Sequence, residues 1–195
     1  MKHLIVYAHP YSESFNHAIL ETTVNALKNN GHEVTVRDLY QLNFQPVLKA
    51  EDTAAMRDGR VPDDIKTEQE YIEKADAITL IYPIWWTGLP AILKGYIDRV
   101  FSYGFAYAVG NEGIIKLLKG KKGFIINTHG TSKEVYDANG MTAGLKVTSD
   151  TGIFDFTGIE PVEHLLFGSV PYVDDAARKD MLKTVENTID SHFPR

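Results

Sequence analysis

Five short segments, each bounded by polar or turn-forming residues, constrain the fold of this 195-residue chain most strongly. They are shorter than ordinary helices and several are rich in β-branched residues, which is typical of strands buried in a sheet. Between them, apolar residues recur at helical spacing. The segments that we predict to be strands are residues 2–8, 32–38, 77–82, 123–127 and 162–167.

The helices between these strands are predicted from periodicity and from their terminal residues. The first ends at Asn29-Asn30-Gly31, a frequent C-terminal signal, and another follows Pro90, which suits a first helical position. The last begins at the acidic pair Asp174-Asp175, which favours a helix N-terminus. We expect helices at residues 18–30, 65–75, 89–101 and 174–192, a further one within 139–159, and irregular structure at 39–64.

Strands that alternate with helices predict an α/β fold with a doubly wound five-stranded parallel sheet of order 2-1-3-4-5. We expect a single domain over residues 1–195. In this order the first, third and fourth strands are neighbours. Ligands of such sheets bind outside the carboxyl ends of the strands. We therefore expect a site where the turns at residues 9–16, 83–88 and 128–136 converge.

Composition excludes several classes of function. The formal net charge is −6 and the basic residues are scattered, which argues against nucleic-acid binding. The chain has no cysteine, so it has no disulfide, thiolate nucleophile or cysteine metal site, and no metal is expected. No apolar run approaches the ~20 residues of a membrane span and no signal peptide is recognisable. We expect a cytoplasmic protein.

The first of the three turns is suited to binding a phosphate group. It is rich in hydroxyl and amide side chains and leads into a helix, whose N-terminal amides and dipole favour an anion. Ser14 and Asn16 can donate to such a group, or they can simply cap the helix. The turn contains neither G-x-G-x-x-G nor G-x-x-x-x-G-K-[ST], so a dinucleotide fingerprint or a P-loop is not the explanation.

The other two turns add a flat wall and a close backbone. Trp85 and Trp86 are adjacent in the second turn, where they either line a ligand or close the core. The third turn has small hydroxyl residues and Gly130, which let backbone amides approach a ring edge. Phosphate donors, an aromatic wall and accessible amides together indicate a flavin site.

Several motifs along nearly the whole chain then resemble one known family. They are Ala8-His9 before Ser14-Phe15-Asn16, Asp38-Leu39-Tyr40 before Asn43-Phe44, the run from Leu89 to Gly95, Arg99-Val100-Phe101, Phe105-Ala106-Tyr107, and Thr128, Gly130, Ser132 and Tyr136. In this combination the sequence resembles the flavodoxin-like NAD(P)H:quinone oxidoreductases. The resemblance implies a ping-pong enzyme in which NAD(P)H reduces a flavin and a quinone then accepts both electrons.

The resemblance also implies residue roles. Tyr136 matches the family's active-site tyrosine, which stabilises charge on the reduced flavin. The implied cofactor contacts are His9, Ser14, Phe15 and Asn16 to the phosphate and ribityl chain, Pro83, Ile84, Trp85 and Trp86 to the ring, and Thr128, His129, Gly130 and Thr131 to its other edge.

Three departures from the family limit this transfer. Mammalian members place a histidine six residues after the tyrosine, where this chain has Thr142, so we consider His129 as a catalytic substitute. The segment 48–62 is shorter than in the larger FAD-binding members, and Arg178 and Asp98 match positions near the adenine, so FAD and FMN both remain open. The family also implies a homodimer with the site at its interface, to which Tyr103, Phe105 and Tyr107 would contribute unless they are core residues.

Two alternative functions remain open at this stage. Some shorter relatives resemble ancillary subunits of bacterial potassium-efflux systems, so the chain is alternatively a regulatory subunit. The other alternative is a flavodoxin-type one-electron carrier, against which the tryptophan-rich pocket argues. A receiver domain of the same topology is disfavoured, because the first strand ends in His9-Pro10 without an acidic pair.

Overall fold

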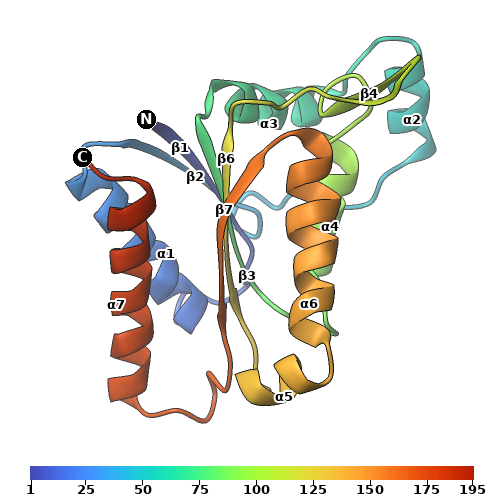
Figure 1. Ribbon diagram of the computed structural model, residues 1–195. Coiled ribbons are helices and arrows are strands. Elements are labelled where there is room, and N and C mark those ends of the chain that lie inside the picture. The colour runs from blue at the N-terminus through green and yellow to red at the C-terminus, as the bar shows by residue number, and fades with distance from the viewer.

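Five parallel strands form the central sheet of the computed structural model, which describes residues 1–195 (Figure 1). Their order is β2-β1-β3-β6-β7, which confirms the predicted order 2-1-3-4-5. β1 is an inner strand, so Leu4 pairs with Thr35 of one neighbour and Ile78 of the other. The strands are β1 (Lys2–Tyr7), β2 (Glu33–Asp38), β3 (Ala77–Pro83), β6 (Lys122–Thr128) and β7 (Glu160–Phe167).

Helices cover both faces of the sheet (Figure 1). Since both faces are covered, the central strand β3 is apolar along most of its length and each of its residues is buried. No helix has the length and apolar character needed to cross a bilayer. One face carries α1 (Phe15–Asn29) and α7 (Asp175–His192), and the other carries α3 (Asp63–Lys74), α4 (Ala91–Val100), α6 (Met141–Lys146) and the π-helical segment η1 (Val147–Asp155).

The sheet divides the apolar core into two clusters. Successive side chains of a strand point to opposite faces, so Leu4 and Val6 pack toward α3 and α4 while Ile5 packs toward α1 and α7. η1 approaches the sheet very closely at Gly123, where a Cβ atom would lie 2.3 Å from the ring of Phe154. Glycine at this position of β6 therefore lets η1 lie directly on the sheet.

Residues 39–64, which we expected to be irregular, contain the helix α2 (Ala50–Arg57) and the first residues of α3. That expectation was wrong because α2 is polar and its position depends on a distant partner rather than on an apolar stripe. Buried Arg99 of α4 pairs with Asp52 at 2.9 Å and with Asp64 at 2.6 Å. Arg99 also donates to the backbone oxygen of Gln45 at 2.9 Å, which fixes the segment that precedes α2.

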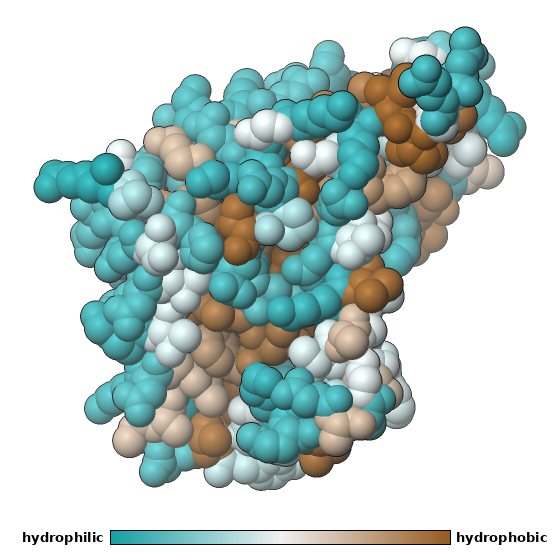
Figure 2. Space-filling view, in the orientation of Figure 1, coloured by the Kyte–Doolittle hydropathy of each residue, from teal (hydrophilic) through white to brown (hydrophobic).

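Other elements between residues 107 and 155 also differ from the expectation. A hairpin of β4 (Tyr107–Gly110) and β5 (Gly113–Lys116) follows α4 and was not predicted, although its turn reads Gly-Asn-Glu-Gly. α5 (Lys133–Ala138) follows β6, and the helix expected within 139–159 is divided between α6 and η1. Apolar side chains of the hairpin are exposed, and Figure 2 shows hydrophobic surface at the same end of the molecule.

Candidate functional site

The turn between β1 and α1 presents unpaired donors at the carboxyl edge of the sheet. Ser14 is the N-cap of α1 and its hydroxyl accepts from the amide of His17 at 3.2 Å. The amides of Phe15 and Asn16 precede the first intrahelical bond and have no acceptor in the chain. The Nδ1 atom of His9 accepts from the amide of Tyr11 at 3.1 Å, so neutral His9 carries its hydrogen on Nε2. Burial lowers the pKa of His9, which favours this neutral form.

Asn16 and Thr128 join the three turns. Asn16 is only 3% exposed, and its Nδ2 atom donates to the hydroxyl of Thr128 at 2.7 Å. The backbone oxygen of Thr128 accepts from the amide of Ile84 at 2.8 Å. The Oδ1 atom of Asn16 is buried and has no donor. Since buried polar atoms are nearly always paired, this oxygen is a candidate ligand contact.

The turn after β3 is a two-residue hairpin that separates the two tryptophans. Trp85 and Gly88 exchange backbone hydrogen bonds of 3.2 and 3.1 Å, and Trp86 and Thr87 have φ values of 51° and 56°. These values are those of a type I′ turn, in which β-branched Thr87 is an unusual residue. Trp85 is consequently 41% exposed with its ring 6.2 Å from that of His9, while Trp86 is fully exposed.

His129 and Tyr136 stack on each other beside the turn after β6. Their ring centroids are 4.2 Å apart and the planes differ by 5°. His129 is 5% exposed, and its Nδ1 atom is buried without a partner. Burial lowers the pKa of His129, which favours the neutral imidazole. Gly168 makes this arrangement possible, since a Cβ atom there would lie 2.9 Å from the imidazole.

These turns enclose one cleft of about 240 Å³ at the carboxyl edge of the sheet. The turn after β7 also contributes, because the amide of Val170 donates to the backbone oxygen of His129 at 3.2 Å. The residues that line the cleft are His9, Ser14, Phe15, Asn16, Pro83, Ile84, Trp85, Thr128, His129, Gly130, Val170 and Pro171.

The structure thus brings together most of the residues that the sequence predicts as a site. Three of them do not line the cleft: Trp86 points into solvent, Thr131 is exposed, and Tyr136 lies behind His129 as a half-buried stacking partner. Val170 and Pro171 line the cleft and were not predicted. Both residues lie in the turn after the fifth predicted strand. The predicted strand order places that strand beside the fourth, so this turn could have been included in the predicted site.

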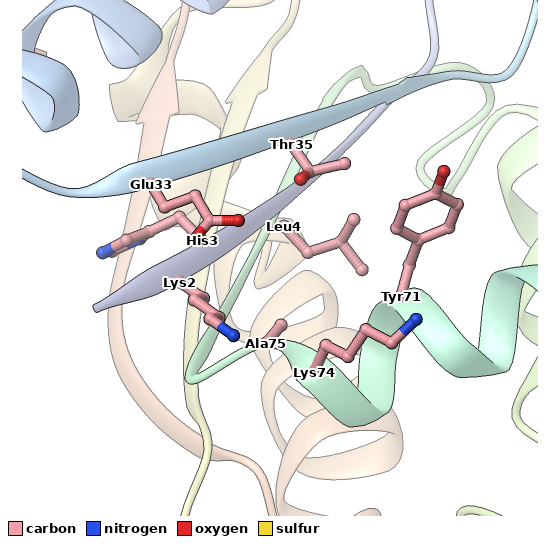
Figure 3. A pocket seen from close by; sticks show the side chains of 8 residues that line it. All are labelled: Lys2, His3, Leu4, Glu33, Thr35, Tyr71, Lys74 and Ala75. Carbon is pink, nitrogen blue, oxygen red and sulfur yellow. The ribbon is translucent and has the colours of Figure 1, made fainter.

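A second cavity lies at the opposite, amino edge of the sheet (Figure 3). It measures about 140 Å³ between the starts of β1 and β2 and the end of α3. Its lining residues include Lys2, Glu33 and Lys74, with Leu4 and the ring of Tyr71 on its apolar side. None of the predicted site residues lies there, and ligands of parallel sheets bind at the other edge. The cleft at the carboxyl edge is therefore the candidate functional site.

Comparisons with known proteins match the chain along almost its full length. A family model described as flavodoxin-like fold matches residues 1–189. An uncharacterized NAD(P)H oxidoreductase of Haemophilus influenzae is 44% identical over 94% of this chain and 91% of the relative. NAD(P)H dehydrogenase (quinone) 1 of Rattus norvegicus is 34% identical over 92% of this chain and 73% of the relative. The structure of a putative quinone reductase from Klebsiella pneumoniae has a TM-score of 0.93 at 30% identity, covering 99% of this chain and 85% of that one.

Proposed function

The chain belongs to the flavodoxin-like NAD(P)H:quinone oxidoreductases, and on this basis we propose that it is a flavin-dependent enzyme that reduces quinones in a ping-pong cycle. When bound, the flavin would supply the redox chemistry by accepting two electrons from NAD(P)H and passing them to the acceptor. The observation that carries this proposal is the single cleft in which the turns after β1, β3 and β6 converge.

The polar atoms of the cleft fit a flavin. A flavin is a flat, largely apolar ring with carbonyl oxygens and an N–H group on its edge, joined to a hydroxylated chain that ends in phosphate. The buried Oδ1 of Asn16 requires a donor, and a buried acceptor without one costs roughly 1–3 kcal/mol. The unpartnered Nδ1 of His129 lies at the same cleft. A ligand hydroxyl or N–H group would satisfy Oδ1 of Asn16, and a ligand carbonyl oxygen would satisfy Nδ1 of His129 when that nitrogen carries the hydrogen of the neutral ring.

The phosphate end of the cofactor would lie at the N-terminus of α1. The amides of Phe15 and Asn16 supply donors there, together with the Nε2 hydrogen of neutral His9. These groups bind an anion without a lysine or arginine side chain in the lining of the cleft. They are common to FMN and FAD, so the present proposal names the flavin class.

The apolar wall and the stacked pair would hold the ring. Pro83, Ile84 and Trp85 line the cleft together with Gly130, whose amide has no acceptor in the chain. Neutral His129 is positioned by its stacking on Tyr136 and offers a hydrogen bond at the ring edge. We assign His129 the role of stabilising charge that develops on the reduced ring, with Tyr136 holding the imidazole in place.

A second copy of this chain would complete the site. Pockets that enclose small ligands typically measure about 300–1000 Å³, so a cleft of about 240 Å³ is smaller than a site that encloses such a ligand on all sides. The chain also exposes an apolar surface that includes Tyr103, Val109, Ile114 and Ile115 on and near the β4–β5 hairpin. Surfaces of this kind mark interfaces, and we propose that this one packs against the same chain in a homodimer.

Flavin content and turnover test the proposal together. The purified protein, supplied with FMN or FAD, is expected to retain one of them with a visible flavin spectrum and to oxidise NADH or NADPH when a simple quinone is present. Mass spectrometry of the extracted cofactor distinguishes FMN from FAD. A protein that retains neither flavin and oxidises neither nucleotide would refute the proposed function.

A matched pair of variants on α1 connects the activity to the cleft. Asn16→Leu removes the buried amide that faces the cofactor, whereas Asn25→Leu changes an exposed asparagine of the same helix. We expect Asn16→Leu to weaken flavin binding at least about tenfold and Asn25→Leu to leave it unchanged. Equal affinity in the two variants would place the cofactor elsewhere, and circular dichroism confirms that both are folded.

A further inference from the structure

A buried polar chain lies on the η1 face of the sheet and is not part of the cleft. Asp150 of η1 and Asn127 of β6 contact the two ring nitrogens of His164, which belongs to β7. The Nδ1 atom of His164 lies 2.7 Å from Oδ2 of Asp150, and its Nε2 atom is hydrogen bonded to Oδ1 of Asn127. The His164 side chain is 1% exposed, so these two groups are its environment rather than water.

The orientation of Asn127 determines which atoms carry hydrogen. Its Nδ2 atom donates to the backbone oxygen of Tyr82 at 3.4 Å, so its Oδ1 atom faces the imidazole. Both ring nitrogens of His164 therefore face an oxygen that can only accept. A neutral imidazole has one N–H group, whereas an imidazolium has two. Full pairing of His164 requires the imidazolium.

The counter-charge is supplied by Asp150. Burial on its own would raise the pKa of Asp150, but the hydrogen bond and the charge of His164 outweigh burial and lower that pKa. The hydroxyl of Ser149 lies 3.1 Å from the same carboxylate, and Lys146 adds a favourable charge. The carboxylate of Glu163 accepts from the amide of His164 at 2.9 Å. A buried charge is tolerated when it is paired and hydrogen bonded in this way.

The chain of contacts ends next to the cleft. Asn127 precedes Thr128, the last residue of β6, whose hydroxyl and backbone oxygen bind Asn16 and Ile84. Adjacent residues of a strand point to opposite faces, so Asn127 is held on the η1 face while Thr128 points toward α1. Asp150 reaches the sheet from a π-helical turn, a rare geometry that often accompanies functional sites.

We propose that Asp150 and His164 are positioning residues of the flavin cleft: as a buried imidazolium–carboxylate pair they hold Asn127, and Asn127 fixes the end of β6 that orients Thr128. The inference rests on the proposed function for the identity of the ligand. The protonation state of His164 does not, because it follows from the contacts of this chain alone.

Ring-nitrogen NMR of the uniformly ¹⁵N-labelled protein tests the pair directly. The His164 signals are assigned by their absence from His164→Gln. From these contacts we expect both ring nitrogens to carry hydrogen in the folded protein, and Asp150→Asn to convert the ring to a single N–H form. A wild-type ring with only one N–H group would overturn the inference, whether or not flavin is bound.

The positioning role is tested by FMN titration of His164→Gln. The matched control is His192→Gln on α7, which changes a partly exposed histidine that lies 3.9 Å from Glu163. We expect His164→Gln to weaken FMN binding about tenfold and His192→Gln to leave it unchanged. If His164→Gln does not fold, Asp150→Asn preserves side-chain size and carries the same comparison.

The possible outcomes separate this inference from the proposed function. Unchanged FMN affinity in a folded His164→Gln or Asp150→Asn variant would overturn the positioning role while the proposed function stands. A wild-type protein that binds no flavin would refute the proposed function and the positioning role together. Weaker binding combined with two ring hydrogens in the wild type would support the full inference.

Discussion

His3 makes the stability of the fold depend on pH in a way that a single substitution can remove. Its side chain is 2% exposed, packs against the rings of His32 and Phe193, and leaves both ring nitrogens without a partner. Burial is the main reason that the pKa of His3 falls from 6.5 to about 4, and the charges of His32, the N-terminus and Lys122 lower it further. The nearby carboxylate of Asp76 opposes this shift without cancelling it.

The direction and size of the effect follow from this pKa. His3 stays neutral in the folded protein down to about pH 4, whereas in the unfolded chain it is protonated below about pH 6.5. The titration of His3 therefore leaves the free energy of unfolding unchanged above about pH 6.5. It lowers that free energy as the pH falls from 6.5 to about 4. The loss contributed by His3 is roughly 2 kcal/mol at pH 5 and reaches roughly 3 kcal/mol below pH 4.

The assay compares wild type with His3→Phe in urea, followed by circular dichroism at several pH values. The substitution removes the titrating ring and leaves no unpaired polar atom, so the difference in unfolding free energy should be constant at alkaline pH and should change by about 2 kcal/mol in favour of the variant by pH 5. Other titrating groups are present in both proteins and cancel in the difference. Parallel stability curves from pH 8 to pH 5 would refute the assignment of a buried, neutral His3.

Three further predictions concern the fold and the assembly. Arg99→Met leaves Asp52 buried without its partner and should cost about 3–5 kcal/mol in urea unfolding; a loss below 1 kcal/mol would contradict the structural role of this ion pair. Gly95→Ala places a Cβ atom 2.1 Å from the backbone oxygen of Pro46 and should lower the urea midpoint of unfolding. This is the opposite of the usual effect, since alanine is the better helix residue by about 1 kcal/mol. A raised midpoint would show that Gly95 and Pro46 do not lie in close contact. Ile115→Lys in the exposed hairpin should convert the proposed dimer to a monomer in light scattering without lowering the melting temperature, and a persistent dimer would exclude the hairpin as its interface.

The sheet was predictable because its signal is local and repeated. Strands such as β3 are continuous apolar segments between turn residues, and the alternation with helices is sufficient to predict their order. The signal for α2 is weak because its position depends on a single charge, Asp52, that pairs with Arg99 more than forty positions away. The β4–β5 hairpin has short strands with exposed side chains, so burial leaves no pattern in its sequence.

The candidate site was predictable to the extent that it consists of turns at strand ends. His9, Asn16 and Trp85 follow directly from the strand order, because parallel strands bring their carboxyl ends to one edge. The outward position of Trp86 depends on the local type I′ turn, which is unusual for the pair Trp86-Thr87 and which composition does not reveal.

The contact between Asp150 and His164 was not accessible from the sequence. It depends on the π-helical turn of η1, because a π-helix presents different residues to the sheet than an α-helix of the same sequence would. It also depends on the register that places His164 of β7 beside β6. Neither residue belongs to a recognisable motif. Side chains of this kind become evident only when the burial and the hydrogen-bond partners of each ring nitrogen are known.

The most direct test of the proposed enzyme is to observe its two half-reactions separately under anaerobic conditions. The flavin-loaded protein is mixed first with one equivalent of NADH or NADPH alone, and the visible flavin absorption is followed before a quinone is added. We predict that the absorption is lost with the nucleotide alone and returns when one equivalent of quinone is added. Absorption that remains unchanged until both substrates are present would contradict a ping-pong flavin enzyme.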